Sequence, residues 1–226
     1  FALVTGATGY IGREMVSGLA RAGAHVLVNS RSLKRAQVLV DELREVGLAA
    51  TEAVFDITCE ADLAAYAATL KTPLSVLINN AYAGGAGTIA TSTPEQYREA
   101  YDVGVVALHR AVRAFLPHLR RAAAAHGEAS VINIASMYGM VSPDLRVYDT
   151  PEGSNPPFYG AAKAALLQWT RYAACEFGPE RIRVNAITPG PFPTAAVQET
   201  QPEFVARLAG KVPLARMGGP GELVGP

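Results

Sequence analysis

The feature that most constrains this chain is the alternation of short apolar runs with longer helical patterns along its whole length. The apolar runs are rich in Val, Ile, Leu and Ala without strict alternation, which is typical of strands covered on both faces. They are Ala2–Thr5, His25–Asn29, Ala50–Phe55, Leu74–Ile78, Ser130–Ala135 and Arg183–Ile187. The helical patterns are Tyr10–Ala22, Ser32–Val46, Glu60–Leu70, Pro94–Arg121 and Phe158–Phe177. This order predicts an α/β fold with a doubly wound parallel sheet and helices on both faces. No linker or composition break interrupts it, so we expect residues 1–226 to form one domain.

A glycine-rich turn joins the first expected strand to the first expected helix. It reads Thr5-Gly6-Ala7-Thr8-Gly9-Tyr10-Ile11-Gly12. Glycine allows a tight turn, a close approach of backbone to a pyrophosphate, and close packing of the helix on the strand. The N-terminus of the helix adds free N–H groups and a partial positive charge. A turn without a ligand is the alternative, but its position after the first strand predicts a Rossmann-like dinucleotide site. We expect cofactor contacts from Gly6, Thr8, Tyr10, Ile11 and Gly12.

The end of the second expected strand bears on the choice between NAD(H) and NADP(H). An acid at this place would bind the adenosine ribose, whereas an arginine would accommodate a 2′-phosphate. The sequence reads Asn29-Ser30-Arg31-Ser32, with no acid. A guanidinium suits phosphate, and small hydroxyl side chains add hydrogen bonds. Ser30 and Arg31 therefore favour NADP(H) over NAD(H), and the alternative is an Arg31 that is merely solvated.

Composition excludes several other classes of protein. Lys and Arg together number 20, as do Asp and Glu, so no global field recruits nucleic acid or an anionic membrane. The two cysteines, Cys59 and Cys175, match no metal or redox spacing, which favours a reducing compartment and no metal site. We find no signal peptide and no apolar run of membrane-spanning length, and we expect a cytoplasmic protein. The chain begins at Phe1 inside an apolar run and ends at Pro226 after a Gly- and Pro-rich stretch, so we expect both ends to be trimmed.

Further motifs follow at the ends of the later strands, and together they resemble the short-chain dehydrogenase/reductase family over nearly the whole chain. They are Asp56-Ile57, Asn79-Asn80-Ala81-Tyr82, Asn133-Ile134-Ala135-Ser136, Tyr159-Gly160-Ala161-Ala162-Lys163 and Pro189-Gly190-Pro191-Phe192-Pro193-Thr194. The resemblance implies an NAD(P)-dependent oxidoreductase with Ser136, Tyr159 and Lys163 as catalytic residues. It also implies cofactor contacts from Asp56, Ile57, Asn80, Ala81, Tyr159, Lys163, Pro189, Gly190, Phe192 and Thr194.

The chain also departs from the family pattern. Gly9 followed by Tyr10 has the glycine spacing of the extended, sugar-nucleotide-modifying relatives. Tyr82 replaces the last glycine of the family's Asn-Asn-Ala-Gly turn. Gly104 stands where relatives place a catalytic asparagine that anchors a water for proton supply. We expect Gly104 to slow turnover, and a Gly104→Asn variant to raise kcat. The alternative is that Gly104 only permits a kink or close helix packing.

Tyr159 and Lys163 lie four residues apart on one expected helix, so they share a face. A free phenol has a pKa near ~10, and bringing it toward ~7 needs roughly 4 kcal/mol of preference for the phenolate. An ammonium about 4 Å away in a medium of dielectric ~20 offers about that much. We therefore expect Tyr159 to be the general acid/base, Lys163 its electrostatic partner and ribose clamp, and Ser136 a donor to the substrate oxygen.

Between Ser136 and Tyr159 the chain is longer than is usual in the family and rich in proline. The alternatives are an ordinary surface loop and one wall of a substrate pocket. For the second, Tyr138, Asp144 and Tyr148 are the expected substrate contacts. Their polar mix favours a hydroxylated substrate such as a sugar acid or a polyol.

Three functions stay open from the residues alone. A carbonyl/alcohol oxidoreductase leads. A sugar-nucleotide epimerase or dehydratase follows from the glycine spacing, and a catalytically impaired NAD(P)-binding scaffold or sensor follows from Gly104. We also expect a homo-oligomer, dimer or tetramer, because the last two helical patterns carry more small and apolar residues than one sheet face covers. These include Ala161, Ala162, Ala164, Ala165, Ala173 and Ala174.

Overall fold

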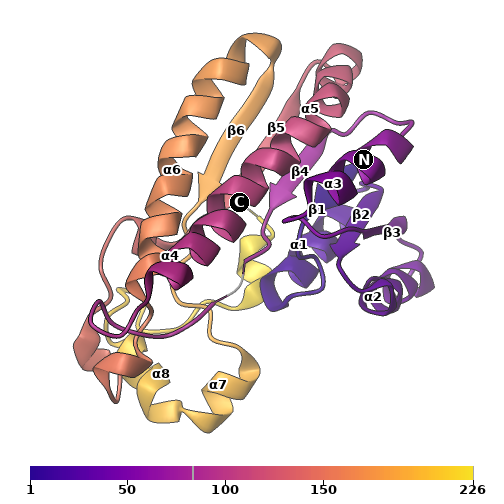
Figure 1. Cartoon of the computed structure of the whole chain (residues 1–226). Helices are drawn as coiled ribbons and strands as arrows, with labels where there is room; N and C mark the ends of the chain where they lie inside the picture. The colour runs from indigo at the N-terminus through magenta and orange to yellow at the C-terminus, as the bar shows by residue number, and fades with distance from the viewer. Residues whose placement is uncertain (83, 226) are drawn as a thin grey trace.

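The computed structural model describes residues 1–82 and 84–225 and has a parallel sheet at its centre (Figure 1). Its strands are β1 (Ala2–Val4), β2 (Val26–Ser30), β3 (Ala50–Val54), β4 (Val76–Asn79), β5 (Ala129–Ile134) and β6 (Ile182–Ile187). They lie in the order β3-β2-β1-β4-β5-β6, and every neighbouring pair is parallel. The direction of winding reverses between β1 and β4. A crevice for a ligand forms at such a switch point, beyond the carboxyl ends of the strands.

Helices cover both faces of the sheet because the strands carry apolar side chains on both. Leu3 and Leu27 point into a core shared with α3 (Glu60–Thr69), α5 (Ala107–His126) and α6 (Pro157–Phe177). Val4 and Val28 point into the opposite core, which is shared with α1 (Tyr10–Arg21) and α2 (Leu33–Glu45). The predicted doubly wound α/β fold is thereby confirmed.

The predicted helix Pro94–Arg121 is not α-helical throughout. The structure has α4 (Pro94–Tyr101), then a π-helical turn, η1 (Asp102–Val106), and then α5. A π-turn carries one more residue per turn than an α-helix and is frequent at functional sites. Gly104 lies inside η1 and is buried. The helix also runs past Arg121 through Ala122–Ala125 and ends at Gly127, whose φ of +91° is left-handed.

The sequence patterns did not predict the short elements at the carboxyl edge of the sheet. Three 3₁₀ turns, η2 (Met137–Gly139), η3 (Leu145–Val147) and η4 (Pro151–Gly153), follow β5. After α6 come a 3₁₀ turn, η5 (Gly178–Glu180), the strand β6, and then α7 (Ala195–Thr200), α8 (Pro202–Ala209) and a last 3₁₀ turn, η6 (Pro220–Leu223). Figure 1 shows α7 and α8 as a separate yellow arm beyond the sheet. In the part of the chain that the structure describes, no helix is long and apolar enough to cross a membrane.

Candidate active site

The glycine turn after β1 is held in close contact with the turn after β4. Gly6 has φ +61°, and a Cβ there would lie 2.9 Å from the Cα of Ala81. A Cβ on Gly12 would overlap the carbonyl oxygen of Gly6. The Thr5 hydroxyl accepts hydrogen bonds from the backbone N–H groups of Asn80 (3.0 Å) and Ala81 (3.2 Å). Both glycines are therefore required by the approach of backbone to backbone at this edge of the sheet.

A groove of about 840 Å³ opens above these turns. Its lining includes eleven of the residues predicted to contact the cofactor: Gly6, Thr8, Tyr10, Ile11, Gly12, Ser30, Arg31, Asp56, Ile57, Asn80 and Ala81. The helix α1 begins here with Gly9 as N-cap, without a side-chain cap and without an acid in its first turn. Its N–H groups are thus available to an anion. Volume, glycine turn and helix terminus all fit a dinucleotide.

The far end of the groove holds two arginines. Arg31 is 81% exposed, and its Nη1 lies 3.9 Å from the Asp56 carboxylate. Burial would raise the pKa of Asp56, but hydrogen bonds from Thr58 and the nearby Arg31 together lower it. Arg35, one turn later on α2, also lines the groove. Arg35 was not among the cofactor contacts predicted from the sequence; the signal that could have found it is a second arginine in the first turn of the helix that follows Arg31.

Ser136, Tyr159 and Lys163 converge where β5 ends and α6 begins. The Lys163 side chain is 4% exposed, and its Nζ donates to the Ile134 carbonyl at 2.6 Å. Burial lowers the pKa of Lys163 to about 8. Burial also raises the pKa of Tyr159, which a hydrogen bond with Ser136 opposes. The pKa of Tyr159 is therefore shifted opposite to the depression expected from Lys163, whose Nζ lies 5.7 Å from the Tyr159 ring centroid and donates to Ile134.

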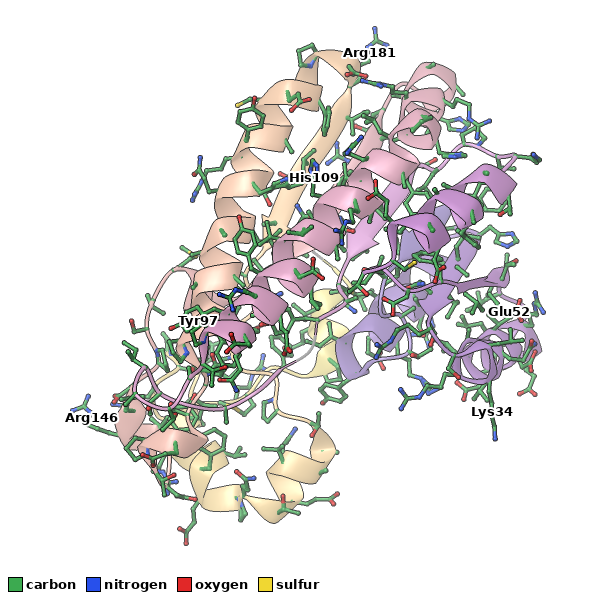
Figure 2. All side chains as sticks on the ribbon, in the orientation of Figure 1. Lys34, Glu52, Tyr97, His109, Arg146 and Arg181 are labelled. Atoms are coloured by element: carbon green, nitrogen blue, oxygen red, sulfur yellow. The ribbon has the colours of Figure 1, made fainter. Side chains whose placement is uncertain are left out.

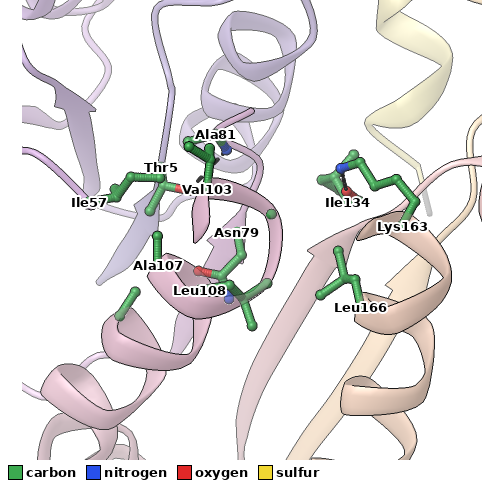
Figure 3. A pocket seen from close by; sticks show the side chains of 12 residues that line it. Thr5, Ile57, Asn79, Ala81, Val103, Ala107, Leu108, Ile134, Lys163 and Leu166 are labelled. Atoms are coloured by element: carbon green, nitrogen blue, oxygen red, sulfur yellow. Dashed lines mark hydrogen bonds between the residues drawn. The ribbon is translucent and has the colours of Figure 1, made fainter. Parts of the chain in front are cut away.

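Lys163 is one of the residues that line a cavity of about 10 Å³ (Figure 3). Asn79, Gly104 and Lys163 border it. Asn79 donates to Asn133 at 2.9 Å, and Asn133 donates to Thr170 at 2.9 Å. The Asn79 Oδ1 is buried and has no hydrogen-bond partner among the described residues. The cavity is about as large as one water requires, and its border is polar on two sides.

The comparisons with known proteins decide the family. The model of the short chain dehydrogenase family matches residues 1–204. This chain belongs to the short-chain dehydrogenase/reductase family. It is thus an NAD(P)-dependent oxidoreductase, and the recognition made from its strand-end motifs is confirmed.

Individual relatives of this short-chain dehydrogenase differ in what their names say they act on. This chain is 30% identical to the rhamnolipids biosynthesis 3-oxoacyl-[acyl-carrier-protein] reductase of Pseudomonas aeruginosa, over 98% of this chain and 85% of the relative. It is 29% identical to the 7alpha-hydroxysteroid dehydrogenase of Escherichia coli, over 98% of this chain and 83% of the relative. Among solved structures, a gluconate 5-dehydrogenase of Burkholderia cenocepacia in complex with NADP and tartrate has a TM-score of 0.86 and 26% identity, over 99% of this chain and 84% of the other.

Residues 189–194, which follow β6, are not among the described residues that line the groove of this short-chain dehydrogenase. Pro189 accepts a backbone hydrogen bond from Met137 at 3.0 Å, which places this stretch beside the Ser136 turn. The Phe192 ring packs against Gly218, and the Thr194 hydroxyl caps α7 by accepting from the Val197 N–H. Contact of Pro189, Gly190, Phe192 and Thr194 with a cofactor stays a prediction.

Of the three predicted substrate residues, Tyr138 and Tyr148 contact each other, whereas Asp144 forms ion pairs with other residues. The Tyr138 and Tyr148 hydroxyls lie 3.2 Å apart, and burial raises the pKa of Tyr138, with smaller contributions from Tyr148 and Tyr159. Asp144 instead pairs with Arg146 (2.8 Å) and Lys211 (2.9 Å), which hold the pKa of its carboxyl low. Asp144 thus ties the inserted segment to the chain after α8.

Proposed function

We propose that this enzyme transfers a hydride between the nicotinamide of NADP(H) and a carbonyl/secondary alcohol pair, with Tyr159 as general acid/base. The observation that carries this proposal is the convergence of Ser136, Tyr159 and Lys163 at the carboxyl edge of the sheet. The large groove begins at the same edge, so a bound dinucleotide and these side chains would share one site.

Each of the three side chains has a distinct role in this proposal. The Tyr159 phenol donates a proton to the carbonyl oxygen in reduction and accepts it from the alcohol in oxidation. The Ser136 hydroxyl donates a hydrogen bond to the same oxygen and stabilises its developing charge. The Lys163 ammonium stabilises the Tyr159 phenolate. The bound nicotinamide supplies or accepts the hydride, and its oxidised form adds positive charge beside Tyr159.

We propose a preference for NADP(H), supported by Arg31 and Arg35 and by the absence of an acid at Ser30. Two guanidinium groups at one end of the groove suit a 2′-phosphate. The NADP in the Burkholderia cenocepacia gluconate 5-dehydrogenase complex is consistent with this preference.

For the substrate, we propose a hydroxylated carbonyl compound. The paired hydroxyls of Tyr138 and Tyr148 support it, since they lie in the segment that follows Ser136. The gluconate named for one relative has this chemistry, whereas the steroid and the acyl chain named for two others are mainly apolar.

The test is a substrate screen that follows nicotinamide absorbance with NADP(H) and NAD(H), over keto sugar acids, hydroxysteroids and 3-oxoacyl compounds. We expect net turnover that is fastest with the keto sugar acids. Tyr159→Phe should abolish turnover while cofactor affinity stays nearly intact, because the ring remains and only the proton is lost. A Tyr159→Phe variant that retains most of its rate would refute the assignment.

The screen also separates the two other functions that the sequence left open. Substrate conversion without net change in the cofactor would indicate an epimerase or dehydratase. Tight cofactor binding without conversion of any compound would indicate a binding protein.

A further inference from the structure

Tyr82 contacts both members of the Tyr159–Lys163 pair, although it belongs to the turn after β4. The Tyr82 and Tyr159 ring centroids are 5.0 Å apart, with an interplanar angle of 78°. The Lys163 Nζ lies 4.8 Å from the Tyr82 ring centroid and 5.7 Å from that of Tyr159. A cation within about 6 Å of an aromatic ring centroid is attracted by the ring. Tyr82 is therefore the nearer of the two rings to the ammonium.

Gly104 leaves the space into which the Tyr82 ring fits. A Cβ at position 104 would lie 3.3 Å from the Tyr82 Cε2 and 3.4 Å from the Ala162 Cβ. The first distance is tighter than ordinary van der Waals contact, so the Tyr82 ring would have to shift slightly even for an alanine at position 104. The two positions are thus neighbours, and the ring at 82 is accommodated without displacement when position 104 has no side chain.

Few other groups around Lys163 stabilise the buried charge of its ammonium. It donates to the Ile134 carbonyl from β5, and Asn79 from β4 borders the same cavity. Tyr159 faces it from α6, and Ser136 is hydrogen-bonded to Tyr159. No carboxylate among the described residues forms an ion pair with Lys163. Burial therefore disfavours its charge, which the Ile134 carbonyl and the two rings favour, with Tyr82 the nearer ring.

We propose that Tyr82 is a positioning residue whose ring holds the Lys163 ammonium beside Tyr159, in the space that Gly104 leaves open. The ring rather than the hydroxyl performs this task, because the Tyr82 hydroxyl is buried without a partner among the described residues. The proposal rests on the proposed function only where it speaks of turnover; the contact with Lys163 can be tested without a substrate.

The first test is an NMR titration of protein labelled at the lysine Cε. The chain has only four lysines, and a Lys163→Arg variant identifies the Lys163 signal by its loss. In Tyr82→Leu, which keeps the site apolar and filled, we expect the pKa of Lys163 to fall by about half a unit to one unit. In Tyr82→Phe, which keeps the ring, it should stay within about 0.2 units of the wild-type value.

Tyr66→Leu is the matched control. Tyr66 is also a partly buried tyrosine whose pKa burial raises to about 12, but its ring packs against Phe55 and Phe115. It reports the general consequence of losing such a ring, and we expect the Lys163 pKa to stay unchanged. A pKa in Tyr82→Leu that is unchanged or higher would overturn the proposal. So would a Tyr82→Phe variant that behaves like Tyr82→Leu, since the hydroxyl would then be the working group.

The second test is kinetic and uses a substrate found in the screen. A lower pKa leaves a smaller fraction of Lys163 protonated, and the Tyr159 phenolate is then stabilised less. The pH threshold for alcohol oxidation should therefore move upward in Tyr82→Leu by about half a unit. Tyr82→Phe should keep the wild-type threshold. An unmoved threshold in Tyr82→Leu would contradict the role in turnover. If no substrate is turned over at all, the proposed function fails, and the NMR titration still decides the role of Tyr82.

Discussion

At the scale of single residues, the burial of Lys163 has a consequence for stability as well as for chemistry. An ammonium that is almost wholly removed from water is disfavoured unless it is paired. Lys163 has a carbonyl and two aromatic rings in place of an anion. Its pKa of about 8 in the folded chain is below its ordinary value of 10.5. The site therefore retains a charged group that destabilises the fold at neutral pH.

This predicts a pH dependence of folding that is specific to Lys163. Between about pH 8 and pH 10.5 the unfolded chain binds more protons at this residue than the folded one does. The free energy of unfolding therefore rises with pH across that window, as the destabilising charge on Lys163 is lost. Relative to wild type, Lys163→Met should be most stable near pH 7 and should lose that advantage by about pH 10.

The measurement is urea unfolding of both proteins at intervals between pH 7 and pH 10, with Lys71→Met as control for the loss of an exposed lysine. A difference between wild type and Lys163→Met that does not vary with pH would show that Lys163 has an ordinary pKa in the folded chain.

At the scale of elements, the π-turn η1 and the turn after β4 form one unit. Glycine in a helix costs about 1 kcal/mol relative to alanine. The structure gives a reason for Gly104, because the Tyr82 ring occupies the adjacent space. This packing favours the alternative that Gly104 permits close packing, and it opposes the expectation that Gly104→Asn alone raises kcat.

We now expect Gly104→Asn to lower kcat and to reduce the free energy of unfolding by about 1–3 kcal/mol through overpacking. The double variant Tyr82→Gly/Gly104→Asn should recover much of that stability, because the asparagine then has space. A double-mutant cycle should give a coupling energy of about 1 kcal/mol or more. Additive effects would mean that the two positions do not share this space.

The β2–α2 turn is the second element with a functional prediction. Removing one guanidinium from the groove should weaken NADP(H) binding about tenfold in either Arg31→Ala or Arg35→Ala, or roughly 1.4 kcal/mol. NAD(H) binding should change little, since it has no 2′-phosphate. Lys34→Ala is the control, because Lys34 lies on the same helix but points away from the molecule (Figure 2). Equal weakening of both cofactors in the arginine variants would mean that neither reads the phosphate.

At the scale of the whole molecule, the inserted segment and the arm after β6 are held together. Arg207 on α8 donates to the Val147 carbonyl at 2.8 Å and pairs with Asp149. The rings of Tyr148 and Phe204 are 5.3 Å apart. Figure 2 shows Arg146 at the outer end of this part of the molecule. Two segments separated by the length of α6 and β6 thus form one wall beyond the carboxyl edge.

Self-association also belongs to this scale. Of the alanines that suggested it, Ala162 and Ala173 are buried within the chain, whereas Ala161 and Ala164 are exposed on α6. Tyr172 on the same helix is 70% exposed. We predict a dimer or tetramer at micromolar concentration by light scattering, and a smaller species for Ala164→Arg. Val38→Arg, at an exposed apolar position on α2, should not change the mass. A wild-type monomer would contradict this prediction.

The sequence alone determined the order of strands and helices, the doubly wound fold and the residues at the strand ends. These features depend on local hydrophobic periodicity and on turn residues, and both can be identified from neighbouring residues in the sequence. The four-residue spacing placed Tyr159 and Lys163 on one helix face, the family resemblance added Ser136, and the structure brings the three side chains together.

Only the tertiary structure decided the rest. The π-turn interrupts the α-helical pattern predicted for Pro94–Arg121. The engagement of Asp144 by Lys211 and the contact of Tyr82 with Lys163 and Gly104 join separate segments of the chain. Periodicity reports which face of a helix is apolar, but it does not report which side chain from another element fills a given space. Which side chain fills a space depends on close packing in three dimensions. For Gly104, that packing places the Tyr82 ring beside it.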